Sequence, residues 1–186
     1  MITATEIAAV HPELADDFAE TQGLIARFAE LRIERLPFYL TADEFGAVLC
    51  WKLRDQLGRQ QVWRAGNTDK LIRSVTGLAL SVSHCDLDYE QELRVSLLCA
   101  LRGVGVPVAS AVLALVMPEQ YGVIDFRGWR QLFGEERRGF GVADYRRYMV
   151  ELRRLARQLG RTPQEIDFAI WVYDGQQSRA GAHQGR

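Results

Sequence analysis

Apolar residues recur at helical spacing along almost the whole chain, whereas strict alternation of apolar and polar residues over the length of a strand is rare. The pattern predicts an all-α fold. A first helix can open at Pro12 and run into the early thirties, because Pro37 cannot continue it. Thr41, with Glu44 three residues later, forms a capping box that predicts the start of a second helix.

Polar residues ahead of apolar runs mark the next two helix starts. Either Asn67 or Thr68 can cap a third helix, and either Asp86 or Asp88 can cap a fourth. A stripe of leucines that ends at Leu101 predicts that the fourth helix buries one face.

The second half of the chain reads as further helices. After a turn at 102–105, a strongly apolar helix is expected from Pro107 to Met117, and another begins near Phe126. A long penultimate helix follows, which Gly160 can terminate.

The last helix has a strong start signal, because a capping box coincides with proline at the first helical position, at Thr162, Pro163 and Glu165. This helix is expected to end at about Tyr173. We expect residues 1–174 to form a single domain and the polar, glycine-rich residues 175–186 to form a flexible tail.

Composition excludes several classes of protein. Of 186 residues, 48% are hydrophobic, enough to bury the core of one ordinary domain or of two small helical lobes. The three cysteines and three histidines are scattered without a CxxC pair, so neither a disulfide framework nor a metal site is predicted. No apolar stretch approaches the ~20 residues of a membrane span. We expect a soluble cytoplasmic protein without membrane contact.

The net charge of -1 argues against a protein that surrounds nucleic acid with a strongly cationic surface, but the charge is unevenly distributed along the chain. Residues 1–50 carry nine acids and three arginines, a balance of -6, whereas residues 127–161 carry ten arginines and four acids, a balance of +6. The arginines of 127–161 either form one cationic face or simply solvate the outside of a helix.

The sequence Leu101-Arg102-Gly103-Val104-Gly105 separates two apolar helices, so the chain must reverse within a few residues. Glycine permits such a turn through positive φ or close backbone approach. Backbone N–H groups at 103–107 are then expected to point outward beside the positive end of the next helix, where they can hold a phosphate. A plain helical hairpin would need the same glycines, so the turn alone leaves both interpretations open.

The whole span from 101 to 130 resembles the helix-hairpin-helix (HhH-GPD) motif of the base-excision DNA glycosylases. The matching features are Leu101, the hairpin Gly103-Val104-Gly105, Ala109, the apolar run Val112 to Val116, and Ile124-Asp125. Twenty residues separate Gly105 from Asp125, as the family pattern requires. The resemblance implies an HhH glycosylase-like helical domain, with the hairpin motif at about 93–117 and duplex DNA with an extruded base as the partner.

The resemblance implies that Asp125 is the catalytic residue. Breaking an N-glycosidic bond develops positive charge on the sugar, and a carboxylate near C1′ stabilises that charge or activates a water molecule. Asp125 is also well placed to cap the helix that begins at Phe126, a role that needs no catalysis.

The chain departs from the family at two places. Members that also cleave the DNA backbone carry a lysine two residues after the second hairpin glycine, where this chain has Pro107. A monofunctional glycosylase is therefore expected. Lys52 is read either as a surface lysine or as a group acting from another helix. The iron–sulfur cysteines of some relatives are missing, so no metal and no cofactor are expected.

Two groups of residues are candidates for contact with DNA. The hairpin residues Arg102, Gly103, Val104 and Gly105 are candidates for holding a phosphate. Aromatic and cationic residues elsewhere could wedge into DNA, stack on a base or contact phosphate, namely Trp63, Arg64, Tyr121, Arg127, Arg130 and Lys52.

Three functions remain open on the sequence. The first is a monofunctional DNA N-glycosylase that extrudes a damaged or modified base and excises it with Asp125. The second is a non-catalytic DNA-binding or complex-forming protein on the same scaffold, since a fold does not fix a function. The third is a structural helical protein, which dispersed arginines in 127–161 would favour.

Overall fold

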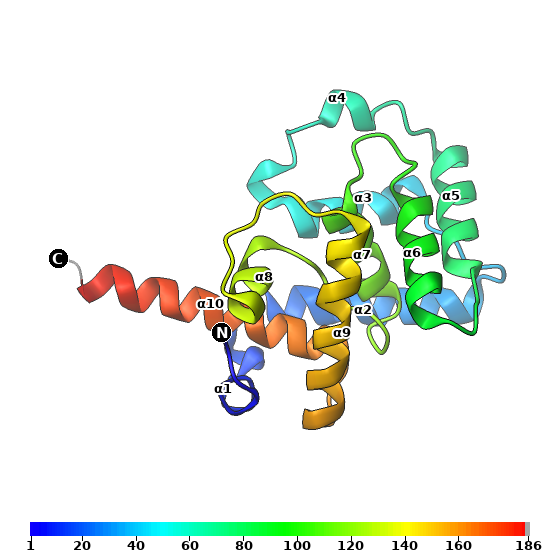
Figure 1. The fold of residues 1–186 in the computed structure, drawn as a ribbon. Helices are drawn as coiled ribbons and strands as arrows, with labels where there is room; N and C mark the ends of the chain where they lie inside the picture. The colour runs from blue at the N-terminus through cyan, green and yellow to red at the C-terminus, as the bar shows by residue number, and fades with distance from the viewer. Residues whose placement is uncertain (185–186) are drawn as a thin grey trace.

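Helices joined by loops make up the computed structural model, which describes residues 1–184 and the side chains of residues 1–179, with no strand among them (Figure 1). This confirms the all-α class. The elements are α1 (Ala4–Ala8), the 3-10 turn η1 (Pro12–Leu14), α2 (Phe18–Glu34), α3 (Ala42–Leu53), the 3-10 turn η2 (Arg54–Gln56), α4 (Gln61–Arg64), α5 (Asp69–Ser81), α6 (Leu87–Leu98), α7 (Val106–Val116), α8 (Phe126–Phe133), α9 (Val142–Leu159) and α10 (Pro163–Gln184).

Local capping signals set most helix starts. The Thr41–Glu44 capping box opens α3, as predicted. Of the alternatives, Thr68 caps α5 and Asp86 caps α6, each through a side-chain oxygen that accepts backbone N–H groups. Gly160 ends α9 in the left-handed region, as predicted.

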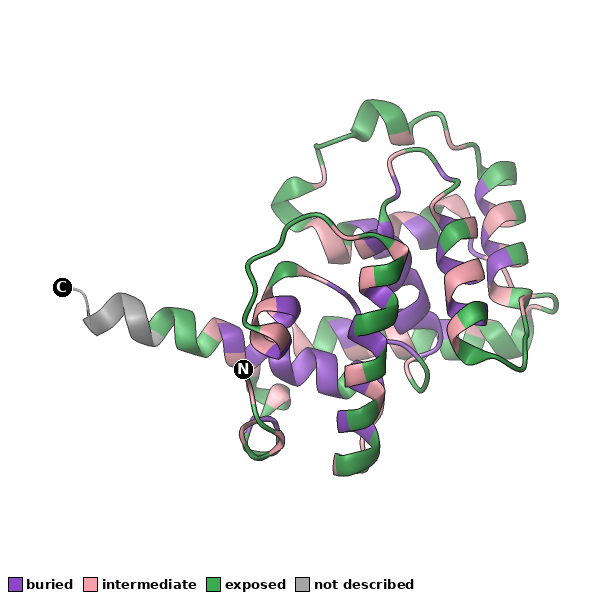
Figure 2. Ribbon diagram, viewed as in Figure 1, coloured by how far each residue is buried: buried purple, intermediate pink, exposed green. Residues whose placement is uncertain are grey.

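Helix α7 is the centre of the fold. All of its residues except Pro107 are buried, and Figure 2 shows it buried among the surrounding helices. It packs against α2, α3, α6 and α9. On one side, α5 packs on α3 and α6; on the other, α10 packs on α1, α8 and α9. The hairpin between α6 and α7 and the loop between α7 and α8 are thereby fixed to the core element.

Four places differ from the sequence predictions. Helix α1, which the Thr3–Glu6 capping box opens, lies in a segment for which no helix was predicted. Pro12 opens only the short turn η1, and the long helix begins at Phe18. The turn η2 and helix α4 lie in a segment, 54–64, for which no element was predicted. Helix α10 runs to Gln184, well past the expected end near Tyr173, so the part of the tail that the structure describes is helical. Residues 185–186 lie outside the described residues.

Membrane contact was not expected from the sequence. Within residues 1–184, no helix combines the length and the apolar character that crossing a bilayer requires.

Candidate functional site

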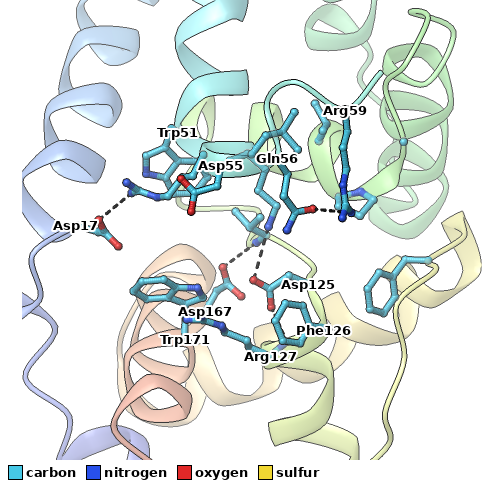
Figure 3. A pocket seen from close by; sticks show the side chains of 18 of the residues that line it. Asp17, Trp51, Asp55, Gln56, Arg59, Asp125, Phe126, Arg127, Asp167 and Trp171 are labelled. Carbon is cyan, nitrogen blue, oxygen red and sulfur yellow. Dashed lines mark hydrogen bonds and ion pairs between the residues drawn. The ribbon is translucent and has the colours of Figure 1, made fainter. Parts of the chain in front are cut away.

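A cleft of about 840 Å³ lies where α3, the segment 54–64, the α6–α7 hairpin, the start of α8 and one face of α10 meet (Figure 3). Both hairpin glycines, Gly103 and Gly105, line it, and so does Asp125. The two ends of the hairpin-to-aspartate motif therefore open into the same space.

Asp125 is both a helix cap and a cleft residue. Its Oδ1 accepts the backbone N–H groups of Arg127 at 3.0 Å and Gly128 at 2.9 Å, which caps α8. Its Oδ2 lies 3.7 Å from Nζ of Lys52. The side chain is 22% exposed. The cap that sequence reasoning set against catalysis is present, and it holds the carboxylate at the cleft, beside the positive end of a helix.

Lys52 comes from the last turn of α3 and faces the cleft rather than open solvent. Its side chain is only 12% exposed, and its ammonium group pairs with Asp125. The surface-lysine interpretation is therefore wrong. Lys52 and Asp125 are far apart in the sequence, so the tertiary fold, in which α3 packs on α7 and α8 packs on α10, brings this amine and this carboxylate together.

Asp167 is a further carboxylate in the cleft, beside Asp17, Asp55 and Asp125, and it was not among the site residues predicted from the sequence. It lies on α10 and is 8% exposed. It accepts hydrogen bonds from the Tyr148 hydroxyl at 2.5 Å and the Val123 N–H at 3.0 Å. In Figure 3 the carboxylates of Asp125 and Asp167 lie side by side. Burial, followed by the charge of Asp125, raises the pKa of Asp167 from 3.8 to about 7.

Gly128 makes room for the group that contacts Asp167. A Cβ atom at this position would lie 2.1 Å from the hydroxyl oxygen of Tyr148. Glycine therefore lets the Tyr148 side chain pass the first turn of α8 and reach Asp167. Burial raises the pKa of Tyr148 well above 10, so this hydroxyl keeps its proton.

The hairpin glycines differ in conformation. Gly103 has φ +69°, in the left-handed region, whereas Gly105 is extended with φ -104°. Among the residues that the structure describes, the backbone N–H groups of Gly103, Gly105 and Val106 donate to no acceptor. The N–H of Val104 donates to Leu101, so the expectation that Val104 offers an anion contact is wrong. Three open N–H groups around the start of α7 can receive an anion.

The segment 54–67 is fastened onto the hairpin. The Asn67 side chain donates to the carbonyl of Arg102 at 2.9 Å and accepts its N–H at 3.0 Å. Arg64 Cγ lies 2.8 Å from where a Cβ of Gly103 would be, and the Arg64 guanidinium donates to the carbonyl of Leu57. Arg64, which was predicted as a DNA or base contact, therefore lies beside the hairpin and lines the cleft.

Of three other predicted contacts, Trp63 and Arg102 are exposed and Arg127 is half-buried. Trp63 on α4 is 68% exposed at the outer edge of the segment that is fastened to the hairpin. Arg127 lines the cleft, and its guanidinium carbon lies 4.9 Å from the ring centre of Trp171, which also lines the cleft. Arg102 is exposed beside the hairpin.

One predicted contact is wrong, and a second has another explanation. Tyr121 is 1% exposed, because residues 121–124 cross the core between α7 and α8, so it cannot stack on a base. Arg130 does not line the cleft. Its guanidinium is bound to Asp174 at 2.7 Å and to Glu136 at 3.1 Å, and these ion pairs explain the arginine.

Most of the arginine block does not converge on the hairpin. Only Arg127 and Arg138 of the ten line the cleft. Others form ion pairs elsewhere on the described surface, for instance Arg146 with Glu92 and Arg153 with Asp88 on α6. The solvated-face alternative therefore holds for most of the block, which is the outcome that favours the third interpretation, a structural helical protein. The other cations of the cleft come from 52–64, a segment that the charge count did not single out, and they are Lys52, Arg54, Arg59 and Arg64.

Comparison with known proteins gives no neighbour: no protein-family model, curated protein or solved structure matches the chain. The residues that the structure describes also contain no cluster of histidine, cysteine, aspartate and glutamate that could hold a metal ion. Function is therefore inferred from the geometry of the cleft.

Proposed function

We propose that this protein is a monofunctional DNA N-glycosylase of the helix-hairpin-helix type, which extrudes a damaged or modified base into the cleft and hydrolyses its N-glycosidic bond. The observation that carries the proposal is the position of Asp125 in the same cleft as Gly103 and Gly105. A carboxylate for the sugar and an anion-binding turn for a backbone phosphate are what excision of an extruded nucleotide requires.

Binding begins at the hairpin. A phosphate of the DNA backbone accepts the open N–H groups of Gly103, Gly105 and Val106 at the positive end of α7. Exposed Arg59 and Arg102 neutralise flanking phosphates. The extruded base enters the cleft, which the aromatic rings of Phe168 and Trp171 line.

Chemistry falls to Asp125. As the bond to the base lengthens, positive charge develops on the sugar, and the carboxylate stabilises it or takes a proton from the attacking water. Lys52 holds Oδ2 of Asp125 in the cleft, while two N–H groups of α8 hold Oδ1. This fixes the carboxylate before the substrate arrives, and preorganisation of charge is an effective form of catalysis.

The test is excision on duplex and single-stranded oligonucleotides that carry uracil, hypoxanthine, 8-oxoguanine, alkylated purines, mismatches or modified cytosines. The wild type should produce abasic sites on at least one substrate, and Asp125→Asn should lose this activity while it keeps DNA binding. Asp144→Asn is the matched control, because Asp144 also accepts a backbone N–H at a helix start and pairs with an arginine, but lies outside the cleft. Its activity should be unchanged.

Borohydride in the same reactions separates two kinds of glycosylase. A hydrolytic enzyme gives no covalent adduct, because no amine attacks C1′. Lys52 is the one amine that lines the cleft among the described residues. A trapped adduct that disappears in Lys52→Gln would replace the hydrolytic step with a Schiff-base step.

The second candidate, a non-catalytic DNA-binding protein, is favoured by one observation. Both oxygens of Asp125 are already engaged, one with the N–H groups of α8 and the other with Lys52. Under this alternative, Asp125→Asn binds DNA as the wild type does and neither protein excises any base. Abasic sites formed by the wild type alone would eliminate it.

A further inference from the structure

One face of α10 supplies an acidic group to the cleft, on the wall beside Asp125. Gln164, Asp167, Phe168 and Trp171 follow the helical spacing and all line it. Phe168 and Trp171 stack with ring centres 5.9 Å apart and planes 14° apart. Asp167 is therefore placed between a polar amide and two aromatic rings, on the wall beside Asp125.

The two carboxylates have opposite surroundings. Asp125 has an ammonium group and two backbone N–H groups. Asp167 forms no ion pair within the described residues. The titratable groups that face it are Asp125 of α8, Lys52 of α3 and Tyr148 and Tyr145 of α9.

Those surroundings raise the pKa of Asp167. Hydrogen bonds from Tyr148 and Val123 and the charge of Lys52 favour the ionised form of Asp167, but burial and the Asp125 charge outweigh them, which brings its pKa to about 7. Two neighbouring carboxyl groups, one paired with an ammonium group and the other buried without an ion pair among the described residues, are typical of a site with one acid and one anionic group.

We propose that Asp167 is the proton donor to the departing base, and that the substrate is therefore a neutral base whose bond to the sugar breaks only when the base is protonated. This rests on the proposed glycosylase function. A cationic, alkylated base leaves as a neutral molecule without a donor, so it has no need of Asp167.

Atoms and charge are conserved in this reaction. The C1′–N bond breaks and its electron pair goes to the base, while a ring nitrogen of the base takes the proton from Asp167. Water adds to C1′ and gives its proton to Asp125. The products are the neutral base and an abasic sugar, with one water consumed; proton exchange with solvent restores both carboxyl groups.

Single-turnover excision tests the assignment, with duplexes carrying hypoxanthine, 8-oxoguanine or mismatched adenine as neutral bases and 7-methylguanine as the cationic one. Asp167→Asn keeps an oxygen that can accept the Val123 N–H. It should slow release of the neutral base by about 100-fold or more, with unchanged DNA affinity. Release of 7-methylguanine, where the wild type shows it, should change by less than about threefold, because no proton is needed.

The pH profile gives a readout that a purely structural role would not move. Wild-type excision should fall as pH rises through about 7, where Asp167 loses its proton. Tyr148→Phe removes a hydrogen bond that lowers the pKa of Asp167, so the fall should move to higher pH. This second variant decides the matter if Asp167→Asn does not fold.

The outcomes separate the two proposals. If Asp167→Asn excises a neutral base as fast as the wild type does, Asp167 is not the proton donor, but the glycosylase function is unaffected. The same conclusion follows if the wild type excises only 7-methylguanine, or if the pH profile is unchanged in Tyr148→Phe. A wild type that excises no base overturns the proposed function, and the role of Asp167 falls with it.

Discussion

Replacing Gly128 with alanine should disrupt the contact between Tyr148 and Asp167. The new Cβ would lie 2.1 Å from the Tyr148 hydroxyl oxygen and 3.0 Å from its Cζ. Tyr148 is fully buried on α9, so its ring has no space into which it can retreat without displacing its neighbours. The substitution must therefore move either Tyr148 or the start of α8, which carries Asp125.

The magnitude follows from three terms. Overpacking a filled core costs about 1–3 kcal/mol. Loss of the Tyr148–Asp167 hydrogen bond costs about 1–3 kcal/mol. Alanine in place of glycine in a helix returns about 1 kcal/mol. The expected net loss is about 3 kcal/mol, a large fraction of the roughly 5–15 kcal/mol that holds a typical domain folded.

Urea denaturation of wild type and Gly128→Ala measures this loss. Gly46→Ala is the matched control, because Gly46 lies inside α3 and a Cβ there would meet nothing within 4 Å. It should be as stable as wild type or slightly more stable. Adding Tyr148→Phe removes the closest clash, so the double variant should lose less than the two single losses combined. Strict additivity, or a Gly128→Ala protein of wild-type stability, would refute the steric reasoning.

Three further changes have defined outcomes. Gly103→Ala should lower the free energy of unfolding in urea by about 1–2 kcal/mol and weaken duplex binding, because φ +69° disfavours a side chain. Gly105 has φ -104° and space for a Cβ, so Gly105→Ala should lose less. Equal losses in the two variants would contradict the geometry. The Arg35 guanidinium lowers the pKa of Glu44 to about 2. The Arg35–Glu44 pair therefore stabilises the folded protein fully above pH 4.5, the ordinary pKa of the carboxyl group, and this stabilisation disappears as the pH falls towards 2. Wild type and Glu44→Gln should therefore differ in urea at pH 7 and converge at low pH; a constant difference would refute this. Lys52→Gln should slow excision, and Lys70→Gln, at an exposed position of α5, should not. Equal excision rates in the two variants would show that Lys52 has no role in the site.

Helix starts were predictable because they depend on residues three or four positions apart. Thr41 with Glu44, and Thr162 with Glu165, form their capping boxes as the sequence indicates. The cap by Asp125 was predictable for the same reason. The helical turns of segment 54–64 were not predictable, because they are short, have no apolar periodicity of their own and are held in place by contacts with the hairpin.

The site itself depended on contacts between distant elements, which local patterns do not encode. Lys52 reaches Asp125 only because the fold brings the end of α3 beside the start of α8. Asp167 offered one signal, a carboxylate between Ile166 and Phe168 in the apolar run of α10. Burying a charged residue costs free energy unless the residue has a partner, so a carboxylate among buried neighbours is a candidate for a functional site. Tyr121 carried no signal that distinguished a core residue from a base-stacking one.

Base excision by wild type, Asp125→Asn and Asp144→Asn on the same DNA substrates tests the central proposal most directly. Abasic sites formed by wild type and by Asp144→Asn, and lost in an Asp125→Asn protein that still binds duplex DNA, are the predicted result. Excision that survives in Asp125→Asn, or no excision by the wild type on any substrate, would contradict it.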